Sequence, residues 1–387
     1  MLRLILLLVL SLFSAGCGFI NSYLRGSDNR IPPAKLMPIE RPIAIQALWN
    51  VQVGRGQGKG FIKLAPAVDG GRVYAASHDG VVMAIDAGTG QIIWNMQTKL
   101  PISAGVGLGD DVLLVGTGEG EVLALYRQTG KEAWRAKVSS EVLAAPRAAQ
   151  GIAVVRTVDG KFIGLDARSG EQRWLYSYTV PALTLRGSAP PVLDQGLVIS
   201  GLETGRLLVL SLANGAPVSA RMIAPPRGRT ELDRMVDIDT EPRVIGAVLY
   251  VTAYQGNITA IDLRSGNTLW SRDFSSFSGL EGDDRRVYIP DENDALWALD
   301  RLNGDTLWRQ EALTGRFLSR PASVGDYVVV GDYEGYLHWL AKSDGRLAGR
   351  VRADSRGIAA APVVQGDTLF VLGKGGTLSA FRAGQGG

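Results

Sequence analysis

An eleven-residue motif recurs along this chain and constrains its fold more than any other feature. The motif is clearest at residues 84–94, which read AIDAGTGQIIW. The starts of successive copies lie 40, 40, 45, 51, 38, 41 and 41 residues apart. Repeats of this length predict either a solenoid or a propeller. The eight copies begin at Ala84, Ala124, Gly164, Val209, Ala260, Ala298, Trp339 and Ala380.

Each repeat contains four short apolar segments that are separated by turns rich in Gly and Asp. In the first repeat these segments fall near residues 64–68, 72–77, 81–86 and 91–94. Apolar side chains alternate along them with the period of a strand, and no helical period is present. Four short strands per repeat are typical of a propeller blade. We therefore predict an all-β fold built from four-stranded antiparallel blades.

The number of copies predicts eight blades and indicates how the ring closes. The last repeat has strands near residues 359–364, 367–372 and 377–382, but no fourth strand follows them. The apolar stretch at residues 44–51 lies near the other end of the chain and contains Trp49. We predict that this stretch is the missing fourth strand, because pairing the first and last strands hides two edges that would otherwise aggregate. Residues 44–387 are thus predicted to be one eight-bladed β-propeller.

The motif itself predicts a tight turn followed by a docking tryptophan. Gly90 can supply a positive φ, and the Asp86 side chain can accept hydrogen bonds from turn amides. A tryptophan on the outermost strand can cover the gap to the next blade and donate its indole N–H. We favour this structural role over cofactor stacking. The tryptophans at or equivalent to the docking position are Trp49, Trp94, Trp134, Trp174, Trp270 and Trp308.

The N-terminal residues predict export and lipidation. One positive charge at Arg3 precedes an apolar run over residues 4–13, which is too short to span a membrane, so residues 1–16 are predicted to be a signal peptide. Ser14-Ala15-Gly16-Cys17 is similar to a bacterial lipobox, although Ser14 stands where Leu is usual. The alternative is an ordinary cleavage site beside an incidental cysteine. Acylation of Cys17 would anchor the protein firmly in a membrane.

The residues after Cys17 predict where the protein resides. Gly18 replaces the Asp that retains lipoproteins at the inner membrane, so the lipoprotein sorting rule implies an outer-membrane protein that faces the periplasm. The stretch that follows is polar and contains several prolines. Residues 17–43 are therefore predicted to be a lipidated cysteine and an extended tether.

Composition excludes several classes of function. The formal charge of +3 falls to +2 when Arg3 is removed with the signal peptide, which is too balanced for a nucleic-acid-binding surface. Cys17 is the only cysteine, so no disulfide can form within the chain. His78 and His338 are the only histidines and lie far apart in sequence, so neither a catalytic triad nor a histidine-based metal site is predicted.

The two longest repeats contain extra residues at equivalent places. The 45-residue spacing is enlarged at residues 175–188, and the 51-residue spacing is enlarged at residues 222–239. Connections from one blade to the next all emerge on one face, so these two insertions should lie side by side. One is apolar with an arginine, and the other alternates acidic and basic residues. We predict a protein-binding site there; the alternative is two solvated insertions.

Four segments make the chain similar to a known family. Residues 183–190 (LTLRGSAP), 230–239 (TELDRMVDID), 261–266 (IDLRSG) and 331–339 (GDYEGYLHW) resemble signature stretches of the BamB family, the outer-membrane lipoproteins of the β-barrel assembly machinery. In that family the first two segments contact the periplasmic POTRA repeats of the barrel subunit, BamA. The resemblance implies that the corresponding contacts here come from Leu183, Leu185, Arg186, Asp237 and Asp239.

The resemblance also implies a function without catalysis, cofactor or metal. The chain would be a scaffold that binds the POTRA domains and other assembly-complex lipoproteins and helps to deliver nascent outer-membrane proteins. Two alternatives remain open. The repeats also resemble those of PQQ-dependent quinoprotein dehydrogenases, which are eight-bladed as well but carry long insertions, a calcium site and often adjacent cysteines. The second alternative is that the chain is a periplasmic scaffold for envelope polysaccharide machinery.

Overall fold

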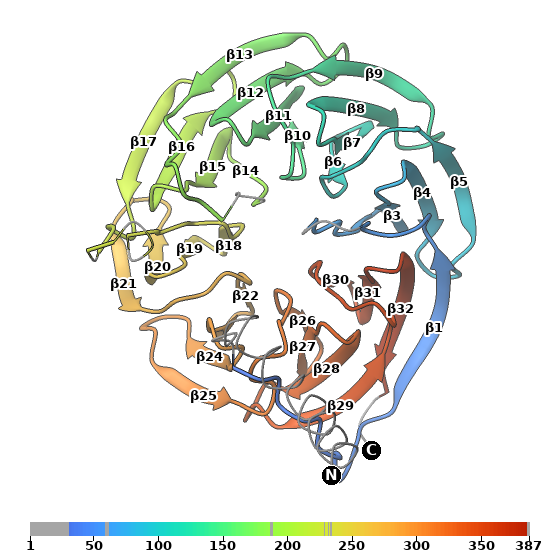
Figure 1. Ribbon diagram of the computed structural model, residues 1–387, viewed down its shortest axis with the longest axis vertical. Helices are drawn as coiled ribbons and strands as arrows, with labels where there is room; N and C mark the ends of the chain where they lie inside the picture. The colour runs from blue at the N-terminus through green and yellow to red at the C-terminus, as the bar shows by residue number, and fades with distance from the viewer. Residues whose placement is uncertain are drawn as a thin grey trace, which may run out of the picture.

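The computed structural model describes residues 31–58, 62–185, 189–227, 229–230, 232 and 234–384. The described residues form eight four-stranded antiparallel sheets around a central axis (Figure 1). The predicted eight-bladed β-propeller is therefore confirmed. The predicted signal peptide at residues 1–16 and the predicted lipidation site at Cys17 lie outside the described residues. No helix in the described part of the chain has the length and apolar character needed to cross a bilayer.

We number the blades in chain order, each from its innermost to its outermost strand. Blades 1 to 4 contain β2 (Ala67–Asp69), β3 (Arg72–Ala76), β4 (Val81–Asp86) and β5 (Ile92–Gln97); β6 (Gly107–Leu108), β7 (Val112–Gly116), β8 (Glu121–Tyr126) and β9 (Glu132–Lys137); β10 (Arg147–Ala149), β11 (Ile152–Thr157), β12 (Lys161–Asp166) and β13 (Gln172–Ser177); β14 (Val192–Asp194), β15 (Leu197–Gly201), β16 (Arg206–Ser211) and β17 (Pro217–Met222). Blades 5 to 8 contain β18 (Arg243–Ile245), β19 (Val248–Thr252), β20 (Asn257–Asp262) and β21 (Thr268–Asp273); β22 (Glu281–Gly282), β23 (Arg286–Pro290), β24 (Leu296–Asp300) and β25 (Thr306–Gln310); β26 (Ala322–Val324), β27 (Tyr327–Gly331), β28 (Tyr336–Ala341) and β29 (Leu347–Arg352); β30 (Val363–Gln365), β31 (Thr368–Leu372), β32 (Thr377–Ala383) and β1 (Ile45–Gln52).

Burial along the strands explains the apolar patterns in the sequence. The two middle strands of a blade lie between neighbouring blades, so both of their faces are buried, as in β4. The outermost strand touches protein on one face only, and burial in β5 accordingly alternates from Ile93 to Gln97. Continuous apolar runs therefore mark middle strands, and alternating runs mark outer strands.

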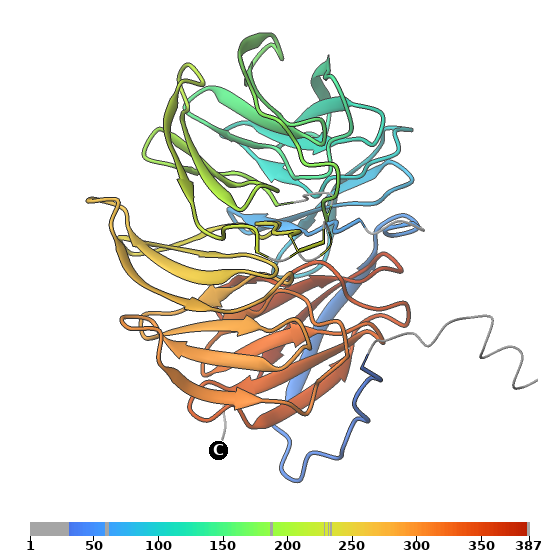
Figure 2. The same ribbon diagram turned by 60° about the vertical axis from the view of Figure 1, so that its left-hand side comes forward.

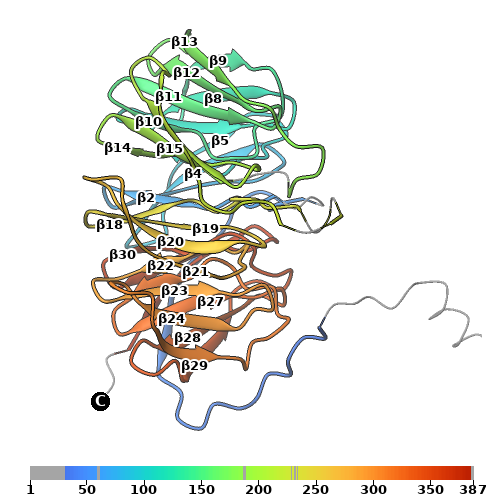
Figure 3. The ribbon, with the colours of Figure 1, turned by 90° about the vertical axis from the view of Figure 1, so that its left-hand side faces the viewer.

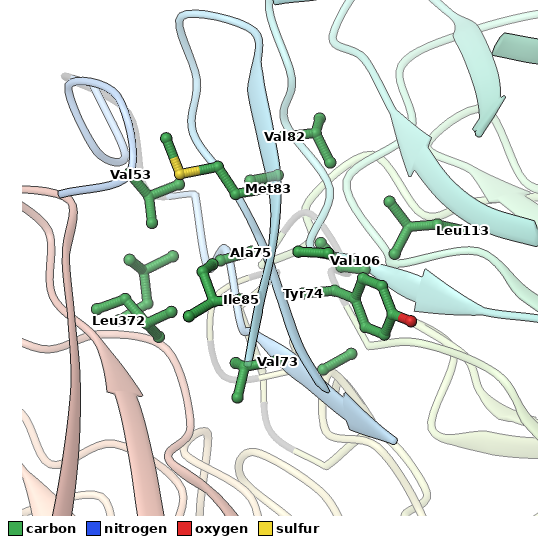
Figure 4. Packing of buried hydrophobic residues seen from close by; sticks show 14 of the residues in the cluster. Val53, Val73, Tyr74, Ala75, Val82, Met83, Ile85, Val106, Leu113 and Leu372 are labelled. Atoms are coloured by element: carbon green, nitrogen blue, oxygen red, sulfur yellow. The ribbon is translucent and has the colours of Figure 1, made fainter. Parts of the chain in front are cut away.

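The hydrophobic core lies between the blades. Figure 4 shows one cluster, in which Tyr74 and Ile85 of blade 1 pack with Leu372 of blade 8 and Leu113 of blade 2. Further clusters join each successive pair of blades from blade 2 to blade 8. Because every cluster is shared by neighbours, the ring is stabilised as one unit and no blade has a complete core of its own.

Each blade places its motif turn on one face of the disc. In the first motif, Asp86 accepts hydrogen bonds from the backbone N–H of Gly88 and of Thr89 at 3.1 and 2.8 Å. Gly90 has a φ of +75°, as the turn requires. The turn thereby reverses the chain into the outermost strand.

The docking tryptophans join six of the eight outer strands to the next blade. Trp174, for example, donates its indole N–H to the carbonyl oxygen of Leu212 at 2.9 Å and lies over Gly215 in the adjacent motif turn. The other five expected tryptophans make the same kind of bond at 2.9 to 3.0 Å: Trp49 to Ala87, Trp94 to Arg127, Trp134 to Ala167, Trp270 to Arg301 and Trp308 to Lys342.

The ring closes where the sequence predicts. β1 pairs antiparallel with β32, and Trp49 lies opposite Ala380. Since β1 comes from the start of the described chain and β32 from its end, blade 8 fastens the two ends of the propeller together (Figure 1). Through this closure β1 pairs with β32, and β32 is paired on both of its edges.

The segment before β1 follows the surface of blade 7. Ala34 N–H donates to the carbonyl oxygen of Thr314 at 2.9 Å, and Arg316 Nη1 donates to the carbonyl oxygen of Ala34 at 2.9 Å. Leu36 packs against the cluster between blades 6 and 7. The described part of the predicted tether, residues 31–43, lies along the edge of the disc (Figure 2). Leu36 and Ile43 pack against the neighbouring blades, whereas Ile31 and Met37 stay exposed.

Candidate protein-binding face

The disc has two different faces because successive strands of a blade alternate in direction. One face carries the motif turns. The other carries the turns between the two middle strands and every connection from one blade to the next; we call it the connection face. The two long connections, residues 178–191 and 223–242, both belong to it (Figure 3). This arrangement agrees with the expectation from the repeat spacing.

The two long connections contact each other directly. The N–H of Leu185 donates a hydrogen bond to the Asp237 carboxylate at 3.0 Å. The N–H of Ala189 donates to the Asp239 carboxylate at 3.2 Å. Asp237 also pairs through its backbone with Tyr254, in the turn between β19 and β20 of blade 5. The second connection therefore lies between the first connection and blade 5.

Leucine side chains are exposed on these connections. Leu183 and Leu185 on the first connection are 45% and 36% exposed, and Leu232 on the second is 66% exposed. A single exposed leucine is ordinary on a protein surface. Three on two connections that touch each other are a feature of surfaces that bind another protein.

The two aspartates predicted to contact a partner occupy different environments. Asp239 is partly exposed, whereas Asp237 is buried. Burial, together with the negative charge of Asp239, raises the pKa of Asp237 to about 7, although the hydrogen bond from Leu185 opposes the rise. Asp237 therefore acts within the chain, where it holds Leu185, and any part it has in binding a partner is indirect.

A buried polar cluster beneath the first connection was not found from the sequence. Arg156 Nη2 donates to Glu203 at 2.7 Å, and the Tyr178 hydroxyl donates to the same carboxylate at 2.8 Å. Arg156 Nη1 also reaches the carbonyl oxygen of Ala189 at 3.5 Å. Tyr178 begins the first connection and Ala189 lies near its end, so the cluster ties both ends of the connection to blades 3 and 4.

The charge on Arg156 is maintained in spite of its burial. Burial alone would lower the pKa of Arg156, but Glu203, Tyr178 and Asp239 together outweigh it and raise the pKa. The side chains of Arg156 and Glu203 are only 2% and 5% exposed. The one sequence signal was an arginine inside the apolar strand IAVVRT, since a charged residue in a middle strand needs a buried partner.

The mouth of the central channel on this face is a cavity of about 1140 Å³. Leu185 and Asp239 line it, so the cavity is continuous with the two long connections. The repeat pattern could not predict it, because its wall is assembled from turns and connections of many blades. Each contributes only one to three residues, and none carries a motif of its own.

An ion-pair network crosses the channel close to this cavity. Glu241, which precedes β18 of blade 5, accepts from Arg147 of blade 3 at 3.1 Å and from Arg320, next to blade 7, at 2.5 Å. Burial alone would raise the pKa of Glu241, but the guanidinium groups of Arg320 and Arg147 outweigh it and lower the pKa to about 2. Blades 3 and 7 are opposite each other in a ring of eight, so Glu241 links two sides of the channel.

Two of the predicted functional residues lie outside the part of the chain that the structure describes. Arg186 lies outside the described residues, as does Cys17. Within the part of the chain that the structure describes, no cluster of three or more His, Cys, Asp or Glu side chains could hold a metal ion. What the described geometry offers is a surface with exposed leucines, a buried support beneath them and an adjoining cavity. Such a surface is suited to binding another polypeptide.

Comparison with known proteins gives a consistent picture. The family model described as "Outer membrane protein assembly factor BamB" matches residues 46–102, 78–310 and 298–387. The chain is 49% identical to the outer membrane protein assembly factor BamB of Pseudomonas aeruginosa, with 97% of each chain covered. It is 50% identical to that of Alkalilimnicola ehrlichii, over 88% of this chain and 89% of the relative.

Two solved structures resemble this chain to different degrees. The crystal structure of BamB from Moraxella catarrhalis matches with a TM-score of 0.80 at 28% identity, covering 88% of this chain and all of that one. Quinohemoprotein alcohol dehydrogenase from Comamonas testosteroni matches with a TM-score of 0.70 at only 15% identity, which shows a shared fold alone. The prediction of an assembly factor over a quinoprotein enzyme is thereby confirmed. The chain belongs to the BamB family of outer membrane protein assembly factors.

Proposed function

We propose that this chain is a lipid-anchored scaffold of the β-barrel assembly complex that binds the periplasmic POTRA domains of BamA through its connection face. The observation that carries the proposal is the pair of exposed leucines on the fixed backbone of the first long connection. Leu183 and Leu185 are exposed there, while Asp237 and the buried Arg156 cluster fix the backbone beneath them. Backbone that is already fixed at Leu185 and Ala189 loses little entropy there when a partner binds.

Binding would combine apolar anchors with charged groups at the edge of the contact. Full burial of a leucine side chain contributes about 1.5–3 kcal/mol, so Leu183 and Leu185 together could supply much of the affinity. Arg186 and Asp239 would add directional contacts and select among partners. No bond-making step is involved. The scaffold would hold the POTRA domains in an arrangement that, with the other assembly-complex lipoproteins, receives nascent outer-membrane proteins.

The proposed location follows from the predicted N-terminal signals. After removal of residues 1–16, acylation of Cys17 would attach the protein to the periplasmic leaflet of the outer membrane. Substitution Cys17→Ser would then release the chain into the soluble periplasmic fraction, as measured by fractionation of cells. A variant that stays in the membrane fraction in cells lacking BamA would contradict the anchor.

The POTRA contact is tested by a double substitution, Leu183→Ser with Leu185→Ser. We expect co-purification with BamA from detergent-solubilised membranes to fall about tenfold or more, because two apolar anchors are removed. The matched control is Leu302→Ser, which changes a leucine that is 76% exposed in a motif turn on the opposite face. Undiminished recovery of BamA with the double variant would refute the site, as would equal loss with the control.

A further inference from the structure

Most of the wall of the cavity on the connection face lies outside the four family-like segments, of whose described residues only Leu185 and Asp239 line it. Its lining comes from the turns and connections of blades 1 to 6, with Ile31 from the segment before β1. The Glu241 ion pairs connect residues of blades 3, 5 and 7 across the channel, and we call the cavity at the mouth of the channel the cup. A volume of about 1140 Å³ is ample for several side chains of a bound polypeptide.

The lining is acidic, in contrast to the chain as a whole. The full sequence carries a formal charge of +3. Among the described lining residues, one lysine, Lys63, stands against five carboxylates: Glu119, Glu141, Asp239, Glu292 and Asp294. Glu119 and Glu292 occupy turns of blades 2 and 6, and both are exposed. Carboxylates in a concave site concentrate their field and attract cations.

An aromatic side chain is held at the rim in a strained conformation. Phe317 is 45% exposed and has a φ of +52°, which is unfavourable for a bulky residue. The Asp294 carboxylate holds it there by accepting the N–H groups of Phe317 and Leu318, both at 2.8 Å. Tyr333 packs edge-on against the ring. Backbone strain that is maintained to expose an aromatic ring is typical of binding sites.

Phe317 and the long connections lie on different sides of the same cup. Leu185 belongs to the connection between blades 3 and 4, and Phe317 to the connection between blades 6 and 7; both line the cavity. A segment that begins on the exposed leucines and crosses the cup would reach Phe317. The acidic lining repels a phosphate or carboxylate ligand, and the dispersed apolar contacts suit side chains along a polypeptide.

We propose that this cavity binds an extended, basic and apolar segment of the polypeptide that contacts Leu183 and Leu185. One Lys or Arg side chain of the segment interacts with Glu119 of blade 2, a second interacts with Glu292 on the opposite side of the ring, and an apolar side chain packs on Phe317. The inference rests on the proposed function, because it extends the same contact surface. The partner would then contact the ring at two places: at Leu183 and Leu185 between blades 3 and 4, and at Phe317 three blades further around the ring.

The first test is photo-crosslinking in cells, with p-benzoylphenylalanine placed at Asn293, whose side chain is exposed and lines the cavity. We expect ultraviolet light to produce an adduct with BamA. The control is the same probe at Leu302 on the opposite face, where no such adduct should form. An adduct from position 302 of equal yield, or none from position 293, would overturn the inference.

The second test is the affinity of the detergent-purified full chain for the purified POTRA region. For Glu119→Gln with Glu292→Gln, we expect about three- to tenfold weaker binding at low salt and a flatter salt dependence. For Phe317→Asn, we expect about tenfold weaker binding. Asn tolerates a positive φ, so this variant should fold at least as well as the parent, which thermal unfolding would verify. Leu302→Ser should bind like the parent.

The outcomes separate the inference from the proposed function. If Leu183→Ser with Leu185→Ser weakens binding and the cavity variants do not, the cavity inference fails and the proposed function stands. If the cavity variants weaken binding and the leucine variant does not, the cavity is the site and the assignment of Leu183 and Leu185 fails. If the parent chain does not bind the POTRA region, both fail.

Discussion

At the scale of single residues, burial decides what a side chain can do on the connection face. Spacing and resemblance place Asp237 and Asp239 on one connection, two residues apart, as equivalent candidates. The structure gives them different positions, since Asp237 is buried beneath Leu185 and Asp239 lines the cavity. Sequence alone could not make this distinction, because in an irregular connection no periodicity indicates which side chains point inward.

The raised pKa of Asp237 predicts a dependence of stability on pH. Its pKa is about 7 in the fold and 3.8 in a model compound, so between these values the folded chain binds the proton more tightly. The stabilisation is complete below pH 4 and is lost as the pH rises through 7. Between pH 5 and 8 the parent chain should therefore lose roughly 1–3 kcal/mol relative to Asp237→Asn, which cannot titrate.

Urea unfolding of both chains at pH 5 and pH 8 measures this difference. The charged groups that face Asp237 are Asp239, Glu203 and Arg156. Glu132→Gln, at an exposed carboxylate on β9, is the matched control and should keep the pH profile of the parent. Parallel profiles for the parent and Asp237→Asn would refute the prediction.

At the scale of elements, the motif couples a large residue on the outer strand to a small one on its neighbour. Trp94 lies opposite Ala84, and Trp174 lies opposite Gly164, where an added Cβ would meet the indole ring. Blade 7 reverses the sizes, because Trp339 lies opposite Gly349 and Ile45 of β1 fills the space above that glycine. Packing thus explains why the copy in blade 7 has lost the motif tryptophan.

The docking tryptophans predict large effects on stability. For Trp174→Phe, we expect the free energy of unfolding to fall by about 1–3 kcal/mol, because the carbonyl oxygen of Leu212 loses its donor and part of the ring contact is lost. For Trp174→Ala, the loss should be about 3–5 kcal/mol. Denaturant unfolding monitored by circular dichroism measures both. The exposed residue Leu302, changed to Ala, should shift stability by less than about 0.5 kcal/mol.

The elements show why the fold was predictable from the sequence and the cavity was not. A blade is a local structure, since its strands and turns come from consecutive residues, and its pattern is repeated until the count of eight is clear. The Glu241 network is formed by residues far apart in the sequence, since Arg147 and Glu241 are 94 positions apart and Glu241 and Arg320 are 79, and the cavity likewise draws its wall from many repeats. Each is an unremarkable residue in its own repeat, so no local pattern indicates that they meet.

At the scale of the whole molecule, the two ends of the propeller depend on each other. A chain that begins at Val53 lacks β1, so β32 becomes an edge strand and the space filled by Trp49 over Gly90 is empty. We expect this chain to aggregate or to exchange strands between copies, whereas a chain that begins at Ile31 should be monomeric. Size-exclusion chromatography with light scattering distinguishes these states. A monomeric, folded chain lacking β1 would contradict the assigned closure.

The docked segment before β1 predicts slow hydrogen exchange where a free tether would exchange at once. The amides of Ala34 and Ile43 donate to carbonyl oxygens of Thr314 and Ala348 at 2.9 and 2.8 Å. Peptides covering residues 31–44 should therefore be protected in exchange measured by mass spectrometry. Leu36→Asn, which removes the apolar contact with blade 7, should increase exchange near Ala34 and leave Ile43 protected. Full exchange in the parent chain would refute the docking.

The pairs that Glu241 makes with Arg147 and Arg320 give the ring a mechanical property that its circular shape would otherwise lack. A ring of blades around an open channel can be deformed into an oval by a force applied at one point. In this ring, such a force would have to separate Glu241 from its two arginines, and this is costly because the side chains of Glu241 and Arg320 are only 15% and 17% exposed. A force that a bound protein applies to one edge of the propeller would consequently rotate the whole propeller as a rigid body.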